Sequence, residues 1–251
     1  RDRSKGLGDR RAKTHAPPFE PWFPPTHFLR IFLLSITSQH SPSMRHFLLL
    51  LGLIPLSLLA QPDPYHSSLL TQLQQDHGLN SGTWLLPANE ATLFSQASTY
   101  GCTRQDLPAT GQPFSQLMQL TVASAGNNPW EAGLAYSSQQ VVQAGDRVLV
   151  VAWLRSPTPQ AAVTLFVEDA TTFAKEVYLD LAPDTGWQQV FISFEAGDAY
   201  PAGELNLGFH LAYQAQQVEI AGFNALNYGS RYALRELPVQ FPVSYAGDDP
   251  N

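Results

Sequence analysis

The chain of 251 residues is poor in the residues that cross-link a fold or bind anions. It has one cysteine, Cys102, and only 14 Lys and Arg side chains. A single cysteine excludes an intrachain disulfide and a cysteine-based zinc site. Residues 61–251 hold six Lys or Arg against 18 Asp or Glu, a formal charge of −12. Because phosphate binding needs clustered cations, this charge argues against a nucleic-acid partner and favours a neutral one.

Catalytic motifs are also missing. The sequence contains no Gly-x-Ser-x-Gly turn and no His-Glu-x-x-His pair. Glu168, Asp169 and Asp180 could supply two carboxylates, but no recognisable acid and nucleophile motif surrounds them. We therefore do not expect this chain to be an enzyme by itself.

A secretory signal peptide is predicted from Met44 to Ala60. Basic Arg45 and His46 precede an apolar run over 47–59, and Ala60 is a small residue at a suitable cleavage point. The run is short for a membrane span of about 20 residues, although an uncleaved anchor is the alternative. The mature protein is thus expected to be secreted. Residues 1–43, with a net charge of +4 and several prolines, are expected to be disordered upstream sequence read through in frame, with a basic targeting arm as the alternative.

The segment Val148–Ser156 has the period of a β-strand with one face in a core. Its inward register is Val148, Val150, Ala152 and Leu154. Its other register contains Leu149, Val151, Trp153 and Arg155. A strand face that points away from the core is normally polar, so the outward tryptophan and arginine suggest a binding surface.

Similar alternation predicts further strands at intervals typical of sandwiches. They are expected over residues 114–122, 130–136, 162–168, 176–181, 187–194, 204–213 and 217–220. No long helical period appears after residue 80. We therefore predict an all-β jelly-roll β-sandwich over residues 82–229. Residues 61–81, which have one weak helical stripe, are predicted to be a leader or linker, and residues 230–251 a second linker.

Several short motifs resemble one known group of proteins. They are Asn128-Pro129-Trp130, Ala144-Gly145-Asp146 leading into Trp153-Leu154-Arg155, Gly186-Trp187 before Phe191–Phe194, and Gln217–Gly222 closing on Leu226–Gly229. Over residues 114–229 the chain resembles the galactose-binding-domain-like jelly rolls, similar to carbohydrate-binding modules, that precede bacterial family-10 glycoside hydrolases, the endo-1,4-β-xylanases.

This resemblance implies a non-catalytic module that targets an appended glycoside hydrolase to a plant or algal polysaccharide such as xylan. We expect the secreted module to be a monomer. It also implies a catalytic barrel after residue 251, so that the chain is a fragment or its gene is truncated. The alternative is a structural or interaction sandwich that packs against its catalytic partner without binding sugar. No cofactor is expected, although the resemblance allows a structural calcium ion to which Glu90 or Asp169 could contribute.

Candidate sugar-binding residues follow from the outward registers. Sugar rings stack on aromatic platforms, for which the candidates are Trp153, Tyr178, Trp130 and Tyr213. Sugar hydroxyls need polar partners, for which the candidates are Arg155, Glu168, Asp180, Asn206 and His210. The site requires that neighbouring strands bring Tyr178, Asp180 and His210 onto the same open face as Trp153. Alternatively, Trp153 belongs to a second small core, and Arg155 simply pairs with Glu168 or Asp180.

Overall fold

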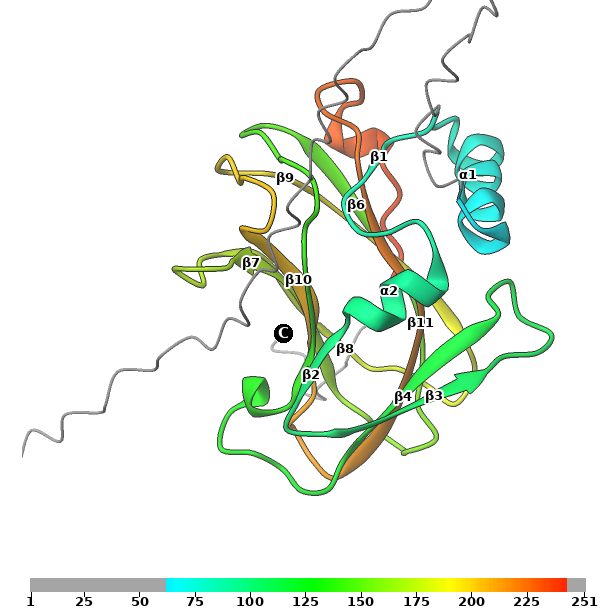
Figure 1. Cartoon of the computed structure of the whole chain (residues 1–251), viewed down its shortest axis with the longest axis vertical. Coiled ribbons are helices and arrows are strands. Elements are labelled where there is room, and N and C mark those ends of the chain that lie inside the picture. Colours follow the sequence, from blue (N-terminus) through cyan, green and yellow to red (C-terminus); the bar gives the residue numbers. More distant parts are fainter. Residues whose placement is uncertain (1–61, 243–251) are drawn as a thin grey trace, which may run out of the picture. The chain divides into compact units, whose positions relative to one another are not determined.

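Two antiparallel sheets make up the fold of residues 62–242, the part of the chain that the computed structural model describes (Figure 1). Sheet A has the order β3 (Thr103–Pro108), β4 (Gln116–Val122), β11 (Gln216–Asn227), β6 (Arg147–Arg155) and β9 (Gln188–Glu195), with β1 (Thr83–Trp84) paired to β11. Sheet B has the order β2 (Ser98–Tyr100), β5 (Gly133–Ser137), β10 (Leu205–His210), β7 (Val163–Asp169) and β8 (Lys175–Leu181). The predicted all-β sandwich is therefore confirmed.

The core between the sheets is built by the alternation that the sequence shows. Val148, Val150, Ala152 and Leu154 of β6 are all fully buried, and they belong to one cluster with the inward residues of β7 and β10. Burial of one such aliphatic side chain stabilises the fold by about 1.5–3 kcal/mol. The inward register predicted for these strands is thus confirmed.

A second core lies on the outer face of sheet A. Helix α1 (Pro64–His77) buries Tyr65, Leu69 and Leu73 in a cluster with Leu149 and Val151 of β6. The outward register of β6 is apolar because a helix covers it. This differs from the leader or linker predicted for residues 61–81, since the weak leucine stripe there is the packed face of a helix.

Local sequence signals define both ends of α1. The Asp63 side chain accepts a hydrogen bond from the backbone N–H of His66, and Pro64 occupies the first turn, where its missing N–H costs nothing. At the other end Gly78 adopts the left-handed conformation, with φ 68°, and its N–H donates to the Gln74 carbonyl. The helix therefore ends before β1.

Other boundaries also differ from the prediction. The helix α2 (Glu90–Gln96) and the strands β1, β2 and β3 were not predicted, and β11 continues seven residues beyond the predicted end. Trp130 lies in a short 3-10 helix, η1 (Pro129–Glu131), rather than in β5. Within the predicted linker 230–251, a second 3-10 helix, η2 (Leu234–Glu236), is followed by buried Leu237, and Gln240 pairs with Phe191 of β9.

The predicted signal peptide and the predicted upstream segment 1–43 lie outside the described residues, as does the end of the predicted C-terminal linker. Neither α1 nor α2 is long and apolar enough to cross a membrane.

Candidate functional site

The outer face of sheet B carries polar and aromatic side chains in cross-strand rows. Antiparallel pairing sets residues side by side, and successive rows on one face are about 7 Å apart. One row runs Lys175, Glu168, Asn206, Ser137; the next runs Tyr178, Phe166, Gly208, Ala135; the third runs Asp180, Thr164, His210, Gly133, Tyr100. Residues that are far apart in the sequence thus meet on one surface.

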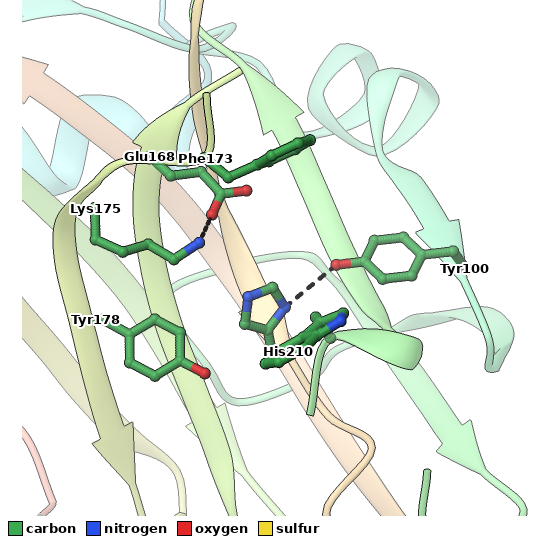
Figure 2. Close-up of a pocket in the computed structure, with 7 residues that line it drawn as sticks. Tyr100, Glu168, Phe173, Lys175, Tyr178 and His210 are labelled. Carbon is green, nitrogen blue, oxygen red and sulfur yellow. Dashed lines mark hydrogen bonds and ion pairs between the residues drawn. The ribbon is translucent and has the colours of Figure 1, made fainter. Parts of the chain in front are cut away.

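A cavity of about 830 Å³ opens on this face (Figure 2). It is lined by Tyr100, Trp130, Glu168, Phe173, Lys175, Tyr178 and His210. Such a volume falls within the range of about 300–1,000 Å³ that is usual for small-molecule sites. Trp130, Phe173 and Tyr178 are 54%, 61% and 44% exposed. Every exposed Trp, Phe or Tyr between residues 62 and 242 therefore lines this cavity.

Two glycines of sheet B, Gly208 and Gly133, leave no room for a Cβ atom, which would also meet the backbone carbonyls of Leu134 and Phe209. A Cβ atom on Gly208 would come within 2.9 Å of the Phe166 ring, and one on Gly133 would come within 2.7 Å of the Tyr100 hydroxyl. The Phe166 ring in turn stacks on the His210 imidazole, with centroids 4.2 Å apart and planes 16° apart. Phe166 and His210 thus form a stacked aromatic pair on the outer face of sheet B.

His210 is neutral at physiological pH. Burial, reinforced by the nearby Lys175 ammonium, lowers the pKa of His210 to about 4. Burial is also the largest cause that raises the pKa of Tyr100 to about 12, so its hydroxyl keeps its proton. The Tyr100 oxygen lies 3.4 Å from Nδ1 of His210. When this hydroxyl donates to Nδ1, the imidazole proton lies on Nε2, which leaves one neutral hydrogen-bond donor on His210.

The charged groups of the cavity form an ion pair. Lys175 Nζ donates to Glu168 Oε2 (Figure 2). It lies 5.7 Å and 5.9 Å from the ring centroids of Tyr178 and Phe166. A β-bulge between Val167 and Glu168 sets Lys175 opposite Glu168. The site thus combines aromatic surface, one ion pair and neutral hydrogen-bonding groups. This combination suits an uncharged ligand that has both apolar faces and hydroxyl groups.

Seven of the nine predicted site residues lie on this side of the molecule. Trp130, Glu168, Tyr178 and His210 line the cavity. Asp180 and Tyr213 lie beside it, where the Thr164 hydroxyl (2.6 Å) and the Tyr213 hydroxyl (3.2 Å) donate to Asp180 Oδ1. Asn206 accepts a hydrogen bond of 2.8 Å from the Ser137 hydroxyl in the neighbouring strand.

Trp153 and Arg155 are misplaced in the prediction. They belong to β6 of sheet A, whereas Tyr178, Asp180 and His210 belong to sheet B, so the single open face that we predicted for all five is wrong. Trp153 is half-buried against Phe114, at 5.9 Å between ring centroids, in the second core.

The Arg155 guanidinium donates to Glu219, not to Glu168 or Asp180, and lies 4.7 Å from the centre of the Trp187 ring. Both Trp153 and Arg155 therefore have structural partners on sheet A.

Three cavity residues were not predicted: Tyr100, Phe173 and Lys175. Tyr100 ends a three-residue strand that has no readable alternation. Phe173 lies in the loop between β7 and β8. A phenylalanine in the short segment 169–175, between the predicted strands 162–168 and 176–181, is the sequence signal that could have identified it.

The resemblance allows a structural calcium ion, to which Glu90 or Asp169 could contribute. Among the described residues, no group of three or more His, Cys, Asp or Glu side chains could hold a metal ion. The Glu90 carboxylate accepts from the backbone N–H and the hydroxyl of Ser115. Asp169 accepts from the backbone N–H groups of Thr171 and Thr172.

No family model and no curated protein matches this chain. Similar solved structures include the second N-terminal cellulose-binding domain of β-1,4-glucanase C from Cellulomonas fimi, with 22% identity, a TM-score of 0.47, and coverage of 59% of this chain and 97% of that one. The CBM22-1 xylan-binding domain of Xyn10C from Paenibacillus barcinonensis has 13% identity, a TM-score of 0.43 and coverage of 60% and 98%. Both are named for the polysaccharide that they bind, cellulose for the first and xylan for the second.

Proposed function

We propose that this chain is a non-catalytic carbohydrate-binding module and that the cavity on sheet B binds a stretch of polysaccharide. The observation that carries the proposal is the gathering of all exposed Trp, Phe and Tyr side chains of residues 62–242 around one cavity. Sugar rings present apolar faces that stack on Trp and Tyr, whose amphipathic rings suit such contacts. Hydroxyl groups of the sugar would hydrogen-bond to His210, Tyr100 and the Glu168–Lys175 pair.

Simple energetics predict weak binding. If Trp130 and Tyr178 each cover roughly 100 Å² of sugar, the gross gain is about 5 kcal/mol at about 25 cal/mol/Å². Association costs about 4 kcal/mol or more, so hydrogen bonds to hydroxyls must supply most of the net affinity. We expect dissociation constants from micromolar to millimolar. Such affinities suffice for a module tethered to another domain, because tethering raises the effective concentration.

The cavity does not support hydrolysis of the glycosidic bond. That reaction usually needs two carboxylates about 5–10 Å apart. Glu168 is the one carboxylate among the residues that line the cavity, and Lys175 pairs with it. The proposed role is therefore binding, in the service of a separate catalytic domain.

We further propose where the module acts and which polysaccharide it binds. The module is secreted through the signal peptide predicted at Met44–Ala60, and it targets a glycoside hydrolase, an endo-xylanase by the motif resemblance, to a neutral glycan such as xylan. The charge of −12 over residues 61–251 supports a neutral ligand. The competing function is an interaction sandwich, in which the same exposed aromatic rings pack against a catalytic partner.

Affinity electrophoresis in gels that contain xylan, β-glucan or mannan tests the binding function. We expect retardation of the wild-type chain in at least one gel. Trp130→Ala combined with Tyr178→Ala should abolish it, because both platforms are lost. Val141→Ala, at a side chain that is 52% exposed and does not line the cavity, is the matched control and should be retarded like the wild type. No retardation of the wild type in any gel would favour the interaction sandwich, and retardation that survives the double substitution would refute the site.

A further inference from the structure

Phe173 has a backbone conformation that disfavours its own side chain. Among the described residues other than glycine, only Phe173 and Gln160 have positive φ, at 60° and 56°. In this left-handed region Cβ approaches the backbone, so glycine and asparagine are the usual residues and a bulky aromatic is an outlier. Hairpin loops often contain one such position, where glycine is the default.

The loop that carries Phe173 is tightly held. The Phe173 N–H donates to the Asp169 carbonyl at 3.0 Å, and the Asp169 N–H donates to the Ala174 carbonyl at 2.9 Å. The Asp169 carboxylate also accepts from the backbone N–H groups of Thr172 and Thr171, at 2.6 Å and 2.9 Å. These two bonds, that from Thr172 first, lower the pKa of Asp169. The loop is thus an ordered turn, which keeps residue 173 in the left-handed region.

The Phe173 side chain is largely exposed, so its burial contributes little free energy to offset the unfavourable backbone conformation. Phe173 is 61% exposed and lines the cavity together with Glu168 and Lys175 (Figure 2). Exposure of an aromatic ring and a left-handed backbone both oppose phenylalanine at this position. Gln160 differs, because its polar side chain suits an exposed loop and it does not line the cavity.

We propose that Phe173 is a sugar-contacting clamp, whose ring the β7–β8 loop holds ready at the edge of the cavity at the expense of the stability of the free module. This inference rests on the proposed carbohydrate-binding function and adds a third platform, on a loop, to Trp130 in η1 and Tyr178 on β8. Strain at a preorganised contact is a recurrent feature of binding sites. Because the loop is already ordered, the ring would contact the ligand with little loss of conformational entropy.

The test compares Phe173→Gly with Gln160→Gly in the full chain. Each substitution places glycine at a position with a left-handed backbone and so relieves strain there, but only Phe173→Gly removes an aromatic ring from the cavity. Titration calorimetry with the oligosaccharide of whichever polysaccharide retards the wild type would measure affinity, and thermal unfolding would measure stability. We expect Phe173→Gly to leave the Tm unchanged or higher while weakening binding about fivefold to tenfold, the loss typical of one aromatic contact. Gln160→Gly should leave the Tm unchanged or higher and binding unchanged.

Phe173→Tyr provides the positive control. It preserves an aromatic ring on the same strained backbone, so it should bind within about twofold of the wild type. The inference is overturned if Phe173→Gly binds as well as the wild type, or if that substitution clearly lowers the Tm. Failure of the wild type to bind any glycan would instead refute the proposed function.

Discussion

At the scale of single residues, glycine and histidine determine what the cavity can offer a ligand. Gly208 and Gly133 leave room for the rings of Phe166 and Tyr100, and His210 stacks on Phe166. Burial lowers the pKa of His210 to about 4, so this side chain is an uncharged hydrogen-bonding group over most of the physiological range. The stacked His210 and Phe166 rings therefore give this part of the site an uncharged surface.

His210 should make stability depend on pH. Its pKa is about 4 in the folded chain against an ordinary value of 6.5. Between these values the unfolded chain binds more protons than the folded one, so stability falls as the pH drops from about 6.5 to 4. At pH 5 the loss attributable to His210 is at most about 2 kcal/mol relative to pH 7.

Denaturant unfolding at pH 7 and pH 5 measures this effect. His210→Gln removes the titrating group and keeps polar atoms at the site, so its stability should decrease less than that of the wild type between the two pH values. Because His66 and His77 are present in both proteins, the difference between them isolates His210. Equal pH dependence of the two proteins would contradict the buried, neutral state of His210.

At the scale of elements, α1 determines which sheet face is available. The helix covers the outer face of sheet A with Tyr65, Leu69 and Leu73, and the segment after β11 adds buried Leu237 to the same cluster. The outer face of sheet B carries the cavity instead. Helix α1, which lies in the segment predicted to be a leader or linker, therefore explains why Trp153 is not exposed as a platform for sugar.

Truncation of the helix core tests this role of α1. Leu73 is fully buried, so Leu73→Ala should lower the free energy of unfolding by about 2–5 kcal/mol. Sugar binding at a temperature where the variant is folded should stay unchanged, because the cavity lies on the other sheet. Leu234→Ala, at a leucine that is 38% exposed, is the control and should change stability by less than about 0.5 kcal/mol. A stability loss no larger than that of the control would mean that α1 does not hold the second core together.

At the scale of the whole molecule, the negative net charge argues against an anionic ligand. Residues 61–251 have a formal charge of −12, and the cationic Lys175 of the cavity is paired with Glu168. Long-range electrostatics therefore offer nothing to an anionic polymer. Contacts to a neutral sugar are short-ranged and are hardly screened by salt.

Salt dependence distinguishes these ligand classes. We expect the affinity for a neutral polysaccharide to change by less than about twofold between 0.05 M and 0.5 M NaCl, because screening acts on interactions between charges. Polygalacturonate, a polyanion, should not bind at low salt. Binding of polygalacturonate that weakens as salt is added would show that cationic contacts dominate and would contradict the neutral-ligand proposal.

Alternation along the strands was enough to predict a β-sandwich and the inward residues of β6, β7 and β10, because the two-residue period is a local property of extended backbone. The same pattern identified Tyr178, Glu168 and His210 as outward-facing residues. It also treated Trp153 as equivalent to them, since alternation says that a side chain leaves the core but not on which sheet it lies or what covers it.

Tertiary structure decided the rest. Strand order set β6 in one sheet and β7, β8 and β10 in the other, and long-range packing brought α1 over the first sheet only. Tyr100 meets His210 across 110 residues of sequence, a separation that no local pattern encodes. The cavity exists because pairing between distant strands, a glycine in each of two neighbouring strands and one ordered loop converge on a single face, and such convergence depends on the packing of the whole sandwich.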